Sequence, residues 1–129
     1  MTSPEKTVLI IEDEADAAEL FAEMMRVSGF RVLKTSSSAP AIAMMNAEKP
    51  DIVLLDIMMP DVSGLDILRE MRSEPALANI PVVIVSAKSL PADIRNGMEA
   101  GASTYLTKPV GFLELKEAVE RALGNQSAT

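Results

Sequence analysis

The sequence of 129 residues contains no cysteine, no histidine and only one tyrosine. Without cysteine and histidine, disulfide scaffolds, Cys/His zinc sites, thiol nucleophiles and histidine-based catalytic triads are all excluded. Any acid–base or metal chemistry therefore falls to carboxylates, hydroxyls and lysines. The length suits one compact domain with a core and is too short for two.

Positive charge and long apolar runs are also scarce. Twelve Lys and Arg stand against nineteen Asp and Glu, so the net charge is −7 at pH 7, which repels phosphate backbones and anionic lipids. We therefore expect no direct contact with nucleic acid. The longest apolar runs, such as 8–11 and 52–55, are far below the roughly 20 residues of a membrane span, and residues 1–5 lack a signal sequence. These absences favour a cytoplasmic protein that does not bind membranes.

Short apolar runs alternate with longer segments of helical period, a pattern typical of βαβ units around a parallel sheet. Continuous Val, Ile and Leu runs predict three central strands, because helices cover both faces of such strands. These runs are 7–11, 51–55 and 81–85. Two edge strands are predicted at 30–35 and 104–106, since the first alternates in polarity and the second is very short.

Apolar residues at helical spacing predict helices at 14–27, 39–48, 63–72, 91–100 and 111–123. Gly29 and Gly101 stand where two of these helices would end. We expect a single domain over residues 1–129, with its core at 6–123 and with 124–129 as a tail or the start of a linker.

Polar side chains follow the predicted strands. In an open α/β sheet, ligands bind beyond the carboxyl ends of the strands, so these side chains should converge on one rim. They are Glu12, Asp13, Asp56, Ser86 and Lys108. Two carboxylates about 4 Å apart repel each other by about 4 kcal/mol at an effective dielectric of about 20. A divalent cation offsets this repulsion, and an oxygen-only ligand set favours Mg²⁺ over transition metals.

The same rim offers the groups that phosphoryl transfer requires. Magnesium keeps coordination positions free for phosphate oxygens, while Lys108 supplies a positive charge and Ser86 a hydroxyl donor. With no histidine or cysteine present, an aspartate is the candidate nucleophile.

Taken singly, these residues have ordinary structural interpretations. Asp13 would cap the following helix, Asp56 would stabilise a turn, and Glu12 would be a solvated loop acid. Ser86 and Lys108 would be common surface residues. Only the coincidence of all five at strand ends favours a functional site.

Four segments, in order, resemble the receiver domain of two-component response regulators. They are VLIIEDE (8–14), DIVLLDIMMPDVSGLDIL (51–68), IPVVIVSAK (80–88) and EAGASTYLTKPV (99–110). The resemblance spans about residues 6–123. It implies an α/β fold with a five-stranded parallel sheet of strand order 2-1-3-4-5 and helices on both faces, the flavodoxin-like or CheY-like arrangement.

The resemblance also implies roles for the residues of the rim. Asp56 would take a phosphoryl group from a phosphohistidine on a sensor histidine kinase or a histidine phosphotransfer protein. Its Mg²⁺ would be bound by the side chains of Asp13 and Asp56, by the backbone carbonyl of Met58, and by Glu12 through a water molecule.

Four further residues belong to the implied switch. Lys108 would pair with the acceptor carboxylate and then with the phosphoryl group, and the peptide bond before Pro109 would be cis. Ser86 would move to the phosphoryl group and Tyr105 would rotate inward behind it, which would change how the fourth helix, fifth strand and fifth helix bind a downstream protein. The ordinary alternative for Tyr105 is a half-buried ring on an edge strand.

Three positions depart from the usual pattern of the family. Glu12 replaces an aspartate, Ser86 replaces a threonine, and Val110 stands where an aromatic residue is frequent. None of them removes a group that the chemistry requires. We therefore expect a phospho-acceptor protein that modifies itself, acts through protein contacts and is not a turnover enzyme.

Other interpretations stay open. A nearby alternative is a receiver domain excised from a longer regulator or hybrid kinase. A Mg²⁺-dependent phosphohydrolase working through an aspartyl-phosphate usually has a second acid two residues after its nucleophile, where Met58 stands. A flavodoxin-like redox carrier would share the fold, but no Gly/Ser/Thr-rich phosphate loop follows the first strand.

Overall fold

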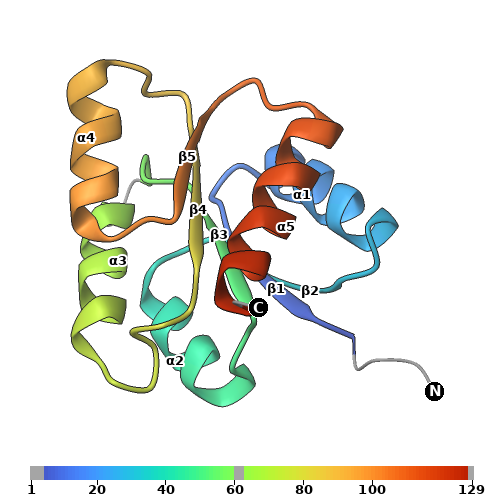
Figure 1. The fold of residues 1–129 in the computed structure, drawn as a ribbon, viewed down its shortest axis with the longest axis horizontal. Coiled ribbons are helices and arrows are strands. Elements are labelled where there is room, and N and C mark those ends of the chain that lie inside the picture. The colour runs from blue at the N-terminus through green and yellow to red at the C-terminus, as the bar shows by residue number, and fades with distance from the viewer. Residues whose placement is uncertain (1–4, 60–62, 128–129) are drawn as a thin grey trace.

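The structure is a computed structural model that describes residues 5–59 and 63–127. Five parallel strands form one sheet in the order β2-β1-β3-β4-β5, which confirms the predicted fold class and strand order (Figure 1). The strands are β1 (Thr7–Ile11), β2 (Arg31–Thr35), β3 (Ile52–Leu55), β4 (Val82–Ser86) and β5 (Thr104–Thr107). The helices are α1 (Ala15–Val27), α2 (Ala39–Glu48), α3 (Gly64–Ser73), α4 (Pro91–Ala100) and α5 (Phe112–Ser127).

Helices cover both faces of the sheet. Helices α1 and α5 lie on one face, and α2, α3 and α4 lie on the other (Figure 1). In β1, Val8 and Ile10 pack under α1 and α5, while Leu9 and Ile11 pack under α2 and α3, because successive strand side chains point to opposite faces. Each fully buried aliphatic side chain stabilises the fold by about 1.5–3 kcal/mol relative to its exposed state.

Burial distinguishes the central strands from the edges, as the sequence predicts. Every residue of β1, β3 and β4 is buried, whereas the residues of β2 and β5 are exposed or half-buried. The carboxyl ends of β1, β3 and β4 therefore lie at the buried centre of the sheet.

The predicted end of the last helix is wrong. Helix α5 continues past Leu123 to Ser127, so Gly124 lies inside the helix instead of ending it. Glycine weakens a helix by only about 1 kcal/mol relative to alanine, which the rest of the helix can offset. Gly29 and Gly101 do have positive φ angles, of 96° and 114°, and follow α1 and α4 as predicted.

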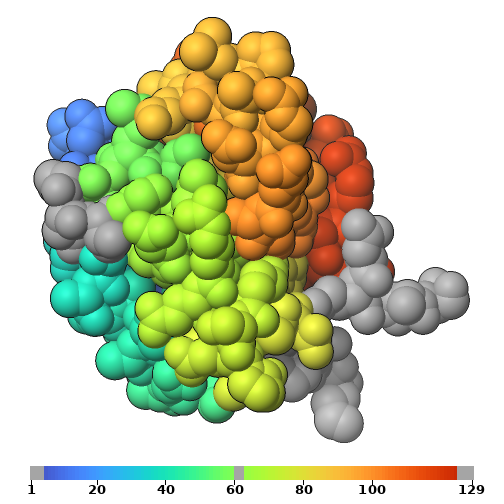
Figure 2. Space-filling view, turned by 90° about the vertical axis from the view of Figure 1, so that its left-hand side faces the viewer, coloured from blue at the N-terminus to red at the C-terminus, as the bar shows by residue number. Residues whose placement is uncertain are grey.

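Arg72 fastens α3 to the end of α4. Its Nε and one terminal nitrogen donate to the carbonyl of Gly101 at 3.1 and 2.8 Å. The other terminal nitrogen donates to the carbonyls of Ala78 and Ile80 at 3.0 and 2.8 Å. The half-buried guanidinium thus satisfies carbonyls from the end of α4 and from the loop before β4. Figure 2 shows the resulting face, on which α3 and α4 lie side by side.

Over the described ranges, none of the helices combines the length and apolar character that a bilayer crossing requires.

Candidate functional site

The carboxyl ends of β1 and β3 bring three acidic side chains together. Ile11 and Leu55 are paired neighbours in the sheet, and the amide of Asp56 donates to the carbonyl of Ile11 at 3.0 Å. Glu12 and Asp56 therefore leave the sheet side by side. Carboxylate oxygens of Glu12, Asp13 and Asp56 all lie within 4.8 Å of one another. The predicted convergence of these acids is present in the structure.

Lys108 is the positive charge of the site. Its ammonium nitrogen lies 2.8 Å from Oε1 of Glu12 and 3.0 Å from Oδ2 of Asp56. The loop that carries it is tied to β4, because the backbone amide of Lys108 donates to the carbonyl of Ser86 at 2.8 Å. The ammonium also lies 5.9 Å from the centre of the Phe21 ring, within range of a cation–π interaction.

The buried carboxylates of Glu12 and Asp56 have the same pattern of hydrogen bonds, in which one oxygen accepts from a backbone amide and the other from Lys108. One oxygen of Asp56 accepts from the amide of Met58 at 2.8 Å, and one oxygen of Glu12 accepts from the amide of Glu14 at 3.2 Å. The other oxygen of each binds Lys108. Backbone amides on one side and a lysine on the other hold both carboxylates in fixed orientations.

Burial and charge act against each other at this site. Desolvation raises the pKa of Glu12, the hydrogen bonds from Lys108 and the Glu14 amide only partly offset this effect, and the negative charge of Asp56 adds to it. Desolvation also opposes the charge of Lys108, but the hydrogen bonds to Glu12 and Asp56 outweigh it and raise the pKa of Lys108 above its ordinary value. One ammonium therefore balances two buried acids incompletely.

A cavity of about 340 Å³ opens at the acids, and Lys108, Glu14, Met58 and Ala87 complete its lining around them. The candidate ligands are the carboxylates of Glu12, Asp13 and Asp56, and such oxygen ligands suit a hard cation such as Mg²⁺. Asp13 is half-buried, and its carboxylate makes no hydrogen bond or ion pair with any residue of 5–59 or 63–127. The residues present thus fit a magnesium ion.

Ser86 and Tyr105 lie behind the site and are joined through Lys88. Ser86 is the last residue of β4 and is completely buried. Its hydroxyl accepts from the amide of Lys88 at 3.2 Å, and the Tyr105 hydroxyl donates to the carbonyl of Lys88 at 2.7 Å. The peptide bond between Lys108 and Pro109 is cis, the isomer that the resemblance implies.

Comparison with known proteins decides the family. The family profile of the response regulator receiver domain matches residues 8–120. The chain belongs to the response regulator receiver domain family. This confirms the resemblance seen in the sequence and makes the chain a phospho-acceptor of two-component signalling, in which the partner is a histidine kinase.

Two related regulators differ in length. The receiver domain is 30% identical over 120 residues to the polar-differentiation response regulator DivK of Brucella ovis, covering 93% of this chain and 98% of DivK. It is 33% identical over 118 residues to the phosphate regulon transcriptional regulatory protein PhoB of Pseudomonas aeruginosa, covering 92% of this chain. The chain spans only about half of PhoB, 52% of its length.

One solved structure with a similar fold carries a metal ion. The receiver domain of the sensor histidine kinase PA1611 from Pseudomonas aeruginosa PAO1 has a magnesium ion coordinated in its active-site cleft. It is 26% identical to this receiver domain, with a TM-score of 0.86 and coverage of 94% of this chain and 99% of that one.

The structure corrects one ordinary interpretation of the acids in this receiver domain. Asp13 does not occupy the N-cap of α1, because that helix begins at Ala15 and its N-cap is Glu14. Glu14 makes no side-chain capping bond. The carboxylate of Asp13 is therefore not needed for the helix end and stays beside Asp56.

Gly64 is a site residue that the sequence pattern did not reveal. A Cβ at this position would lie 2.7 Å from the carbonyl oxygen of Asp56 and 2.7 Å from Cα of Ile57. The first turn of α3 thus packs directly on the backbone of Asp56, with Ser63 as its N-cap. The signal available in the sequence was a glycine at the first position of this helix, because glycine is a poor helix former.

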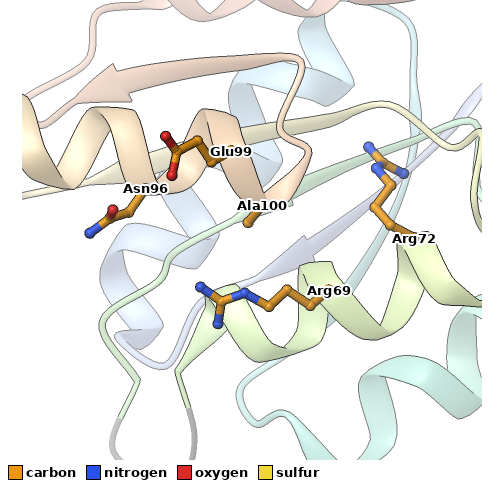
Figure 3. Close-up of a pocket in the computed structure, with 5 residues that line it drawn as sticks. All are labelled: Arg69, Arg72, Asn96, Glu99 and Ala100. Atoms are coloured by element: carbon orange, nitrogen blue, oxygen red, sulfur yellow. The ribbon is translucent and has the colours of Figure 1, made fainter.

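A second cavity, of about 420 Å³, lies between α3 and α4 and away from the acids (Figure 3). Arg69 and Arg72 line it from α3, and Asn96, Glu99 and Ala100 line it from α4. The guanidinium of Arg72 donates hydrogen bonds to backbone carbonyls, and Arg69 forms an ion pair with Asp66. This cavity contains none of the groups that the phosphoryl chemistry requires.

Proposed function

We propose that Asp56 accepts the phosphoryl group in this receiver domain and that Mg²⁺ binds beside it. The observation that carries the proposal is the shared ammonium of Lys108, which contacts both Glu12 and Asp56 at the edge of the acidic cavity. No other aspartate of the described residues combines burial, a lysine partner and neighbouring acids. These features suit a nucleophile whose charge must be balanced during phosphoryl transfer.

The ligands of the metal follow from the same arrangement. Asp13 and Asp56 would bind it through their carboxylates, Met58 through its backbone carbonyl, and Glu12 through a water molecule. The magnesium ion in the cleft of the PA1611 receiver domain supports this assignment. When bound, Mg²⁺ neutralises the acids and the oxygens of the incoming phosphoryl group.

The protein groups carry the transfer itself. A carboxylate oxygen of Asp56 attacks the phosphorus atom, the bond between phosphorus and the donor histidine nitrogen breaks, and its electron pair returns to the imidazole. Lys108 then pairs with a phosphoryl oxygen instead of with Asp56. The hydroxyl of Ser86 binds another phosphoryl oxygen, which requires it to give up the amide of Lys88.

The conformational response follows from that exchange. Lys88 also holds the Tyr105 hydroxyl, so a movement of Ser86 reaches β5 and the start of α4. A phosphoryl group brings a charge of about −1.5 to −2 and forms one to three charge-assisted hydrogen bonds, enough to favour one of two packings. We infer that the face formed by α4, β5 and α5 binds a downstream protein, and the net charge of −7 disfavours nucleic acid as the direct target.

Incubation with Mg²⁺ and acetyl phosphate, followed by intact mass and site mapping, tests the proposal. We expect one phosphoryl group per chain, located on Asp56, and no adduct with EDTA or in Asp56→Asn. Asp66→Asn is a matched control, because Asp66 is an exposed aspartate of α3 that pairs with Arg69 at the surface. An adduct that persists in Asp56→Asn refutes the acceptor, and continuous hydrolysis of an external phosphoester indicates a phosphohydrolase instead.

A further inference from the structure

Helix α4 has a glycine in its interior that no turn explains. Gly97 is buried and lies three residues before the helix ends at Ala100. It is not among the glycines with positive φ, which in the described residues are Gly29 and Gly101. Glycine weakens a helix interior relative to alanine, so its presence needs a packing reason.

The space beside Gly97 is filled by the ring of Tyr105. A Cβ on Gly97 would lie 2.8 Å from Cδ2 and 3.1 Å from Cε2 of that ring, and 2.8 Å from Cδ1 of Ile84. Ile84 and Tyr105 are paired neighbours in β4 and β5. Real Cβ atoms essentially never lie within 3.0 Å of another side chain, so an alanine would have to displace the ring, the isoleucine or the helix.

The seated ring is connected to the phosphoryl site. With the ring against Gly97, the Tyr105 hydroxyl reaches the carbonyl of Lys88 at 2.7 Å. The amide of the same Lys88 donates to Ser86 at 3.2 Å. The packing of the Tyr105 ring against Gly97 of α4 and the hydrogen bond from its hydroxyl to Lys88, in the loop before α4, therefore both depend on one orientation of the Tyr105 side chain.

We propose that Gly97 is a positioning residue for Tyr105. Its missing side chain creates the seat that the ring occupies under α4, with the hydroxyl on Lys88. Filling the seat pushes the ring toward solvent and releases Lys88 from Tyr105. The consequence for signalling rests on the proposed function, whereas the contact between Gly97 and the ring does not.

The composition provides a direct probe, because the chain has one tyrosine and no tryptophan. Intrinsic tyrosine emission therefore reports on Tyr105 alone. We expect Gly97→Ala, in the full chain without phosphodonor, to increase the acrylamide quenching constant of this emission. Gly124→Ala is the matched control, since it is also a helical glycine and a Cβ there meets nothing within 4 Å. An unchanged quenching constant in folded Gly97→Ala overturns the proposal.

A double variant keeps the test decisive if Gly97→Ala is too unstable to fold. Adding Tyr105→Leu removes the ring and should restore more of the thermal midpoint lost in Gly97→Ala than adding Ile84→Val, which removes only the Cδ1 atom at the end of a flexible side chain. An equal or larger rescue by Ile84→Val, or no rescue by Tyr105→Leu, overturns the proposal because the seat would then not belong to Tyr105. Absence of any phosphoryl adduct on the wild-type chain would refute the proposed function and leave these comparisons valid.

Discussion

The ammonium of Lys108 lies closer to Oε1 of Glu12, at 2.8 Å, than to Oδ2 of Asp56, at 3.0 Å. Glu12 is buried, with 2% of its surface exposed, and has the longer arm of glutamate where receiver domains commonly have aspartate. The lysine is thus shared between the proposed acceptor and a second acid. In the proposed transfer Lys108 changes partners, so we expect Glu12 to influence how readily the lysine becomes available.

The first prediction concerns the stability of the metal-free protein. Burial and the charge of Asp56 raise the pKa of Glu12, so the ionised form destabilises the fold relative to the neutral form. The stabilisation of the folded state by neutral Glu12 is therefore fully present below the ordinary pKa of glutamate, about 4.5. It is lost as the pH rises through the higher pKa that Glu12 has in the folded protein. Urea unfolding in EDTA should show Glu12→Gln gaining stability over the wild type as the pH increases from 4 to 7.5. A constant difference between the two across this range would contradict the pKa direction.

Magnesium should offset the destabilisation of the folded protein that is caused by repulsion among Glu12, Asp13 and Asp56. A ligand that binds only the folded state at 100 times its Kd stabilises it by about 2.7 kcal/mol. We expect Mg²⁺ at about 100 times its Kd to increase the free energy of unfolding of the wild type by this amount, and Asp13→Asn to lose most of the increase. Glu114→Gln changes an exposed acid of α5 and serves as the control. Equal stabilisation of Asp13→Asn and the wild type would exclude Asp13 as a ligand.

Gly64→Ala tests the contact between α3 and the acceptor backbone. The new methyl group would meet the carbonyl oxygen of Asp56 at 2.7 Å, so the helix or the acceptor must move. Overpacking of this kind costs about 1–3 kcal/mol, and the displaced carboxylate should react more slowly with acetyl phosphate. Gly111→Ala is the control because a Cβ there has open space around it. Normal stability and normal reaction rates in Gly64→Ala would show that the loop adapts freely.

Arg72→Lys tests the attachment of α4 to α3. Lysine lacks the planar fork that serves the carbonyls of Ala78, Ile80 and Gly101 together. Because hydrogen bonds to charged groups contribute about 1.5–3 kcal/mol each and a lysine that serves one carbonyl leaves the other two without their donor, we expect a loss of at least about 3 kcal/mol in chemical denaturation. Arg69→Lys changes an exposed arginine that pairs with Asp66, and its effect should stay within about 0.5 kcal/mol. Equal losses in both variants would mean that the carbonyl contacts of Arg72 do not stabilise the fold.

The sequence predicts most of the fold because its strongest signals are local. The Val, Ile and Leu runs of β1, β3 and β4 report burial on both faces, and the structure buries every residue of these strands. Helix ends were less predictable. Gly101 ends α4 in a left-handed conformation, whereas Gly124 stays within α5, although a glycine signals an end in both positions. What differs is the packing around each residue, which the sequence does not state.

The acids and the lysine of the site were also predictable, because the carboxyl ends of parallel strands share one edge. The sharing of Lys108 between Glu12 and Asp56 was not, since it depends on the length of the glutamate arm and on the position of the loop after β5. Gly64 and Gly97 escaped notice for a related reason. Each glycine is important because its missing Cβ leaves room for a neighbouring group. That group is the backbone of Asp56 for Gly64 and the ring of Tyr105 for Gly97, and neither contact is visible in the sequence.

The central claim is that Asp56 accepts a phosphoryl group beside a Mg²⁺ ion. A crystal structure of the chain with Mg²⁺ and beryllofluoride, which mimics the phosphoryl group, tests it most directly. We expect beryllofluoride on the carboxylate of Asp56, the metal about 2.0–2.1 Å from oxygens of Asp13 and Asp56, and Lys108 and Ser86 within hydrogen-bond distance of the fluorines. A cavity without the ion, or beryllofluoride on another carboxylate, would contradict the account.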